Sequence, residues 1–189
     1  MESQSLRAVI AAAQTGKAWG FERLLDLYSK RLYGYFLRAT ASHHDAEDLL
    51  SDLTLRLVRT LKHYDHRGRF EPWLFRVAAN MVRDRIRRQK THPPLISLSG
   101  QSTNNRTPGE QVADGQREVD AGLIAEEARG ELNEVLEKLN DTTREMILLR
   151  YFGELTFKEL AELFDCPLGT VLARVHRGLK TLRETIGTK

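Results

Sequence analysis

The pattern of apolar and polar positions near the C-terminus predicts two short helices joined by a tight turn. Thr156 can cap the first helix, and Glu159 three residues later completes a capping box. Asp165 interrupts the pattern, and Pro167 suits the first turn of a second helix because its missing N–H costs nothing there. Apolar stripes are expected on both helices, from Leu160, Leu163 and Phe164 on the first and from Val171, Val175, Leu179 and Leu182 on the second.

The outer face of the second of these helices is expected to be cationic, and it carries Thr170, Arg174, Arg177 and Lys180. Two helices joined in this way are typical of a helix-turn-helix, and such a face suits the major groove of DNA and its flanking phosphates. An ordinary helical hairpin with a solvated basic face would show the same local pattern. The rest of the chain has to distinguish the two.

The first half of the chain is predicted to be helical from about Leu6 to Lys90. One helix is expected to begin near Ser42, and its first turn is acidic, which the helix dipole favours. The apolar side of that helix is formed by Leu49, Leu53, Leu57 and Leu61. Its opposite side is polar and long enough for a docking surface, and it presents Asp48, Asp52, Arg56 and Arg59.

A polar loop at residues 62–71 precedes a further helix that has Pro72 in its first turn. The C-terminal end of that helix is strongly basic, with Arg83, Arg85, Arg87, Arg88 and Lys90. Cations compensate the negative end of the helix dipole at a C-terminus, but this helix end carries more basic residues than such compensation requires. Together with Tyr64, Phe70 and Trp73 they favour binding of single-stranded nucleic acid, since aromatic rings stack on unpaired bases. Burial of these rings in a core remains an alternative.

The composition changes between residues 91 and 125, where Pro, Ser, Thr, Asn and Gly are frequent and the second half is acidic. Such a stretch is longer than most loops within a domain and is typical of a flexible linker. Helical patterns then resume. We therefore expect an all-α chain of two small helical domains, residues 1–90 and 126–189, joined by a flexible polar and acidic linker at 91–125.

Composition narrows the possible functions. The 189 residues have a formal net charge of +3, and their hydrophobic content of 41% suffices for small cores. No apolar run reaches bilayer length and no signal peptide is evident, so we expect no membrane insertion and a cytoplasmic location. Cys166 is the single cysteine, which fits a reducing compartment. We expect it to be a small buried apolar residue, with a redox switch as the alternative.

Two other functions are weighed against nucleic-acid binding by a two-domain factor. His43, His44, Asp45 and Asp48 could suggest a metal-dependent phosphohydrolase, but the other histidines fall elsewhere along the chain. No phosphate-binding glycine loop or nucleophile elbow is present, so no catalytic residue, metal or cofactor is expected. A conventional helix-turn-helix regulator would explain the C-terminal domain but not the aromatic and basic segment near residue 70.

The chain resembles the extracytoplasmic-function class of bacterial sigma factors in the sigma-70 family. Three segments support the resemblance: DAEDLLSDLTLRL at 45–57, FEPWLFRVAANMVRDRIRR at 70–88, and LRYFGELTFKELAELFDCPLGTVLARVHRGLKTLRE at 149–184. It implies a region 2 domain that binds core RNA polymerase and opens the −10 element, and a region 4 domain that binds the −35 duplex. Core polymerase, through its clamp helices and flap, promoter DNA in duplex and single-stranded form, and an anti-sigma factor are the implied partners.

The resemblance also implies which residues take part. The polymerase-binding surface would comprise Asp45, Glu47, Asp48 and Asp52, supported by Leu49 and Leu53. The −10 surface would comprise Tyr64, Arg67, Phe70, Asn80, Asp84, Arg87 and Arg88. The −35 surface would comprise Lys158, Thr170, Arg174 and Arg177. The linker would thread through the polymerase.

Four positions depart from the family pattern. Ser51 stands where this class usually has Gln, and Leu172 and Ala173 replace a basic residue and a Ser in the second helix of the helix-turn-helix. Asp165 replaces the usual turn Gly, and we expect the turn to survive because Asp tolerates the left-handed conformation better than most residues.

Overall fold

The computed structural model describes residues 2–66, 68–91 and 133–186, and these residues form helices and connecting turns without a strand. The N-terminal domain consists of α1 (Glu2–Gln14), α2 (Ala18–Thr40), α3 (His43–Thr60), the short 3-10 helix η1 (Leu61–His63) and α4 (Phe70–Thr91). The C-terminal domain contains a helical segment at 133–137, followed by α6 (Asp141–Phe152), α7 (Phe157–Leu163) and α8 (Leu168–Ile186). The all-α, two-domain prediction is confirmed, whereas the predicted linker lies outside the described residues.

Local sequence features account for several helix ends. The Ser42 side chain accepts a hydrogen bond from the Asp45 N–H at 3.2 Å and caps α3, as the sequence predicts. Pro72 lies in the first turn of α4. Asn140 caps α6, and its side chain accepts a hydrogen bond from the Thr143 N–H at 2.8 Å.

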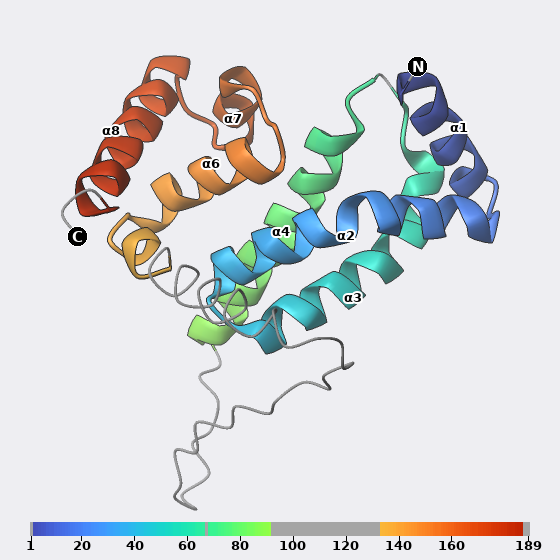
Figure 1. The fold of residues 1–189 in the computed structure, drawn as a ribbon, viewed down its shortest axis with the longest axis horizontal. Helices are drawn as coiled ribbons and strands as arrows, with labels where there is room; N and C mark the ends of the chain where they lie inside the picture. Colours follow the sequence, from blue (N-terminus) through green and yellow to red (C-terminus); the bar gives the residue numbers. More distant parts are fainter. Residues whose placement is uncertain (1, 67, 92–132, 187–189) are drawn as a thin grey trace, which may run out of the picture.

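The two domains pack against each other through α6, which lies beside α2 and α4 (Figure 1). Buried side chains form one continuous core across this junction, from Tyr35, Phe36 and Phe75 in the N-terminal domain to Met146 and Leu149 in the C-terminal domain. A Cβ at Gly34 of α2 would lie 2.9 Å from the Phe152 ring, so the absence of a side chain allows this close approach. The structure is therefore a closed arrangement of the domains.

The apolar side of α8 differs in one respect from the prediction. Val171 and Val175 are buried, but Leu179 is 47% exposed and does not belong to the core. Gly178 occupies the buried position instead. No side chain fits there, because a Cβ at this position would lie 2.6 Å from Cγ2 of Thr143 on α6. The close approach of α6 and α8 thus turns Leu179 toward solvent.

Candidate nucleic-acid interface

The polar face of α3 holds the four predicted polymerase-binding carboxylates. Glu47 and Asp52 are exposed, whereas Asp45 and Asp48 are half-buried. Leu49 is 3% exposed and Leu53 is fully buried, so they can support this face from below but cannot contact a partner directly.

Arg85 of α4 ties the two half-buried carboxylates of α3 to α4. Its guanidinium forms an ion pair with Asp45 and places Nη2 3.3 Å from Oδ2 of Asp48. Gln89 donates a further hydrogen bond of 3.0 Å to Asp45. Burial alone would lower the pKa of Arg85, but hydrogen bonds and charges from both aspartates outweigh it and raise that pKa. Glu47 and Asp52 are therefore the carboxylates best placed to meet a partner.

Three aromatic rings cluster where the loop meets α4. The ring centroids of Tyr64 and Trp73 lie 4.4 Å apart, and that of Phe70 lies 5.5 Å from Tyr64 and 5.6 Å from Trp73. Tyr64 and Trp73 are half-buried, and burial raises the pKa of Tyr64. Phe70 is fully buried, so the expectation that it contacts DNA directly is not met in this arrangement. Phe70 instead supports the other two rings.

The C-terminal half of α4 presents the remaining residues predicted for the −10 surface. Asn80, Arg87 and Arg88 are exposed, and Arg87 donates a hydrogen bond of 3.0 Å to half-buried Asp84. Arg67 lies outside the described residues. Some of these side chains line a groove of about 500 Å³ between α3 and α4, whose walls include Asp52, Leu55, Arg56, Asp84, Arg85 and Arg88. The groove makes the predicted polymerase and −10 surfaces continuous.

Helices α7 and α8 form the predicted helix-turn-helix. The capping box is present, with Thr156 Oγ1 accepting from the Glu159 N–H at 3.3 Å and Glu159 Oε2 accepting from the Thr156 N–H at 2.8 Å. Asp165 has a φ of +46°, so it takes the left-handed conformation that the sequence predicts for the turn. Cys166 in this turn is half-buried.

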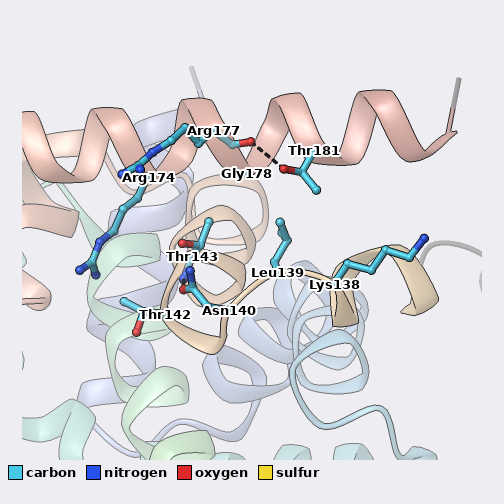
Figure 2. Close-up of a pocket in the computed structure, with 9 residues that line it drawn as sticks. All are labelled: Lys138, Leu139, Asn140, Thr142, Thr143, Arg174, Arg177, Gly178 and Thr181. Carbon is cyan, nitrogen blue, oxygen red and sulfur yellow. Dashed lines mark hydrogen bonds between the residues drawn. The ribbon is translucent and has the colours of Figure 1, made fainter.

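The cationic face of α8 lies next to a hollow of about 510 Å³ (Figure 2). Arg174 is half-buried and extends from α8 toward the start of α6, where Asn140 and Thr142 lie. Exposed Arg177 lines the same hollow and donates to the carbonyl oxygen of Ala173 at 3.2 Å. The positive N-terminal end of α6 adds to the positive potential of these cations, which favours an anion such as a DNA phosphate.

Two further predicted residues lie elsewhere on the helix-turn-helix. Lys158 is exposed on α7, and Thr170 is half-buried on the first turn of α8. The exposed apolar residues Leu168 and Leu172 lie on the same helix. The predicted −35 residues therefore occupy α7 and α8 together, on one domain.

Sequence reasoning missed the residues that join the domains. Arg31, Arg69, Arg76 and Arg83 of the N-terminal domain pair with Glu154, Glu159, Glu162 and Glu145 of the C-terminal domain. The seven-residue spacing of Arg69, Arg76 and Arg83 could have indicated a shared helical side. Nothing local to either domain identifies their partners.

Other features of the described residues bear on the alternative functions. No helix among them is long and apolar enough to cross a membrane. His43 Nδ1 lies 2.8 Å from the Tyr33 hydroxyl, and His44 lies 3.7 Å from Asp48. Within the described ranges, no three His, Cys, Asp or Glu side chains are grouped as metal ligands.

The fold and these surfaces define a two-domain helical DNA-binding protein, and comparisons with known proteins identify its class. Residues 24–92 match the family model for sigma-70 region 2, and residues 129–182 match that for sigma-70 region 4. The chain is 30% identical over 177 residues to the ECF RNA polymerase sigma factor SigW of Bacillus subtilis, covering 94% of both chains. It is 30% identical over 167 residues to the RNA polymerase sigma factor CarQ of Myxococcus xanthus, covering 88% of this chain and 89% of CarQ.

Solved structures agree on the fold. CnrH, solved in complex with the cytosolic domain of CnrY, has a TM-score of 0.66 at 20% identity over 97% of each chain. The sigma factor RpoE of Bartonella quintana, solved with the anti-sigma factor NepR, has a TM-score of 0.63 at 20% identity and covers 88% of this chain and 96% of RpoE.

The chain belongs to the extracytoplasmic-function sigma factors of the sigma-70 family. It is an alternative sigma factor that directs RNA polymerase to promoters, and this family consists of transcription initiation factors. A conventional helix-turn-helix regulator would not account for the region 2 match.

Proposed function

We propose that the two domains divide promoter recognition between three surfaces. The polar face of α3 binds the clamp helices of core polymerase through Glu47 and Asp52, with Asp45 and Asp48 held behind them by Arg85. The continuous groove between α3 and α4 is the observation that supports this assignment, because it joins Asp52 to Asp84 and Arg88. A strand captured by α4 would thus stay next to the polymerase contact.

The −10 element is opened by capture of an unpaired base against Tyr64 and Trp73. Stacking on these half-buried rings and phosphate contacts from Arg87 and Arg88 offset the cost of strand separation. Asn80 and Asp84 offer hydrogen bonds to base edges nearby. Arg67 would add a cation from the loop.

The −35 element is bound as a duplex by α7 and α8. Thr170, Arg174 and Arg177 contact bases or phosphates from α8, and Lys158 holds the backbone from α7. The domain limits we propose are those expected from the sequence, 1–90 and 126–189, with a linker between them. The protein acts in the cytoplasm as a specificity subunit and not as an enzyme.

An anti-sigma factor is a further proposed partner. The structurally similar CnrH and RpoE were solved as complexes, and the RpoE partner is an anti-sigma factor. A partner of this kind would cover the polymerase-binding surface on α3.

Run-off transcription with purified bacterial core polymerase tests the proposal. With a pool of genomic promoter fragments, the protein should produce initiation at a restricted set of start sites that share −35 and −10 sequences. Absence of initiation and of co-migration with core polymerase, from folded protein free of inhibitor, would contradict it.

A further inference from the structure

The junction between the domains is held by arginines on one side and glutamates on the other. The nitrogen-to-oxygen distances are 3.1 Å for Arg31–Glu154, 2.5 Å for Arg69–Glu159, 3.4 Å for Arg76–Glu162 and 2.8 Å for Arg83–Glu145. In all four pairs the cation belongs to the N-terminal domain. The two facing surfaces therefore have opposite charge.

Three of the arginines form a row along α4. Arg69 directly precedes the helix, and Arg76 and Arg83 follow at seven-residue intervals, which is about 10.5 Å of helix per interval. Positions four apart are neighbours on a helix surface, so Arg76 adjoins Asn80 and Arg83 adjoins Arg87. The row therefore borders the proposed −10 surface on the same helix.

The ion pairs that surround the buried apolar core of the junction hold the two domains only weakly. In each of two pairs one side chain is well exposed, Arg69 at 50% and Glu162 at 57%, while the partners Glu159 and Arg76 are 18% and 36% exposed. Ion pairs that are open to solvent on one side stabilise a structure only weakly. Tyr35 Oη and Arg76 Nε are buried and have no hydrogen-bond partner among the described residues. Such unsatisfied groups oppose closure and favour an arrangement that can open.

We propose that Arg69, Arg76 and Arg83 are a phosphate-binding row of the N-terminal domain, which the carboxylates of Glu159, Glu162 and Glu145 occupy when the domains are closed. The acidic side of α6 and α7 then takes the place of a nucleic-acid backbone. This inference rests on the proposed function of α4 and extends it. A single DNA strand and the C-terminal domain compete for the same row of arginines. The free protein therefore binds single-stranded DNA poorly until the domains separate.

A pair of matched double variants tests the competition in the full-length protein. Glu159→Gln with Glu162→Gln removes two junction charges, and Gln at position 159 retains the capping box. Glu134→Gln with Glu137→Gln removes two charges from exposed positions of the same domain. Both double variants change the net charge of the protein by the same amount. A difference in DNA affinity between them therefore cannot come from net charge alone.

The probe is a fluorescein-labelled single-stranded oligodeoxynucleotide of mixed sequence, with binding followed by anisotropy. We expect the junction variant to bind about two- to thirtyfold more tightly than the control, because the carboxylates of two partly exposed ion pairs no longer compete with the oligonucleotide. Small-angle X-ray scattering of the same samples should show a larger radius of gyration for the junction variant. Equal affinities, or a larger radius without tighter binding, would overturn the proposal.

A second comparison examines the row itself. In the background of the junction variant, where two of the competing carboxylates are removed, Arg76→Gln with Arg83→Gln should weaken oligonucleotide binding more than Arg7→Gln with Arg23→Gln, which changes two exposed arginines elsewhere in the N-terminal domain. Equal affinities of these two variants would also overturn it. Run-off transcription by the wild-type protein from the same preparation distinguishes failure of this inference from failure of the proposed function. If transcription succeeds while the matched variants bind the oligonucleotide equally, the inference fails and the proposed function stands.

Discussion

The Nε atom of Arg83 on α4 lies 2.8 Å from Oε1 of Glu145 on α6, and this ion pair joins the two domains. The same guanidinium lies 4.7 Å from the centroid of the Phe164 ring. Burial raises the pKa of Glu145, and the charge of Arg83 reverses this only in part. The closed arrangement should therefore depend on pH.

Glu145→Gln tests this dependence. Because its pKa is raised by folding, Glu145 contributes stability below its ordinary pKa, and that contribution is lost as the pH rises through the raised value. We expect the variant to gain stability relative to wild type as the pH rises above the ordinary pKa of glutamate, since the amide does not titrate. Thermal unfolding midpoints measured as a function of pH check the prediction. Glu137→Gln at an exposed position is the control, and an identical pH profile for both variants would contradict it.

Gly34→Ala should weaken the packing at the domain junction. In a helix interior, Ala is normally more stable than Gly by about 0.5–1 kcal/mol. At position 34, however, the Cβ of Ala would lie 2.9 Å from Cε1 of Phe152. The expected result is a larger radius of gyration in small-angle scattering. Gly169→Ala on α8 is the control, because a Cβ there meets nothing within 4 Å. If both variants scatter like wild type, close packing at Gly34 does not hold the junction.

The turn of the helix-turn-helix gives a stability prediction. Asp165 has a φ of +46°, a conformation that costs Ala about 1–2 kcal/mol and costs Gly little. Asp165→Ala should lower the free energy of unfolding by about 1 kcal/mol, while Asp165→Gly should change it by a few tenths. Denaturant titration measures both. A fully stable Ala variant would mean that the turn relaxes to another conformation.

Local features of the sequence predicted the helix-turn-helix well. The capping box at Thr156 and the left-handed Asp165 depend on residues within one turn, so their spacing was sufficient. The predicted burial of Leu179 was wrong, because the exposure of this side chain depends on how closely α6 approaches α8 at Gly178. The burial of Phe70 likewise depends on contacts with Tyr28 of α2, more than forty residues away along the chain.

The domain junction could not be predicted from periodicity. The ion pair between Arg83 and Glu145 connects residues that share no local pattern, and the hydrogen bonds from Arg31 to the Phe152 carbonyl oxygen, at 2.5 and 3.1 Å, span 121 positions. The roles assigned to Asn80, Arg88, Arg174 and the acidic face of α3 remain predictions.

Arg88→Ala should impair promoter opening without loss of stability. Arg88 is exposed and lines the groove between α3 and α4, so its removal takes away one phosphate contact of the proposed −10 surface. We expect about a fivefold loss of open complexes with core polymerase, equivalent to about 1 kcal/mol. Permanganate footprinting of unpaired thymines measures the effect. Arg23→Ala, at an exposed position of α2, should open promoters like wild type.

The central claim is that polymerase binding and −35 recognition reside on different domains. The most direct test measures the affinities of Asp52→Ala and Arg174→Ala for core polymerase and for a duplex that contains the −35 sequence found by run-off transcription. We expect Asp52→Ala to weaken core binding by about fivefold and to leave duplex binding unchanged, and Arg174→Ala to do the reverse with a reduced salt dependence. Loss of core binding in Arg174→Ala, with its duplex binding intact, would contradict the account.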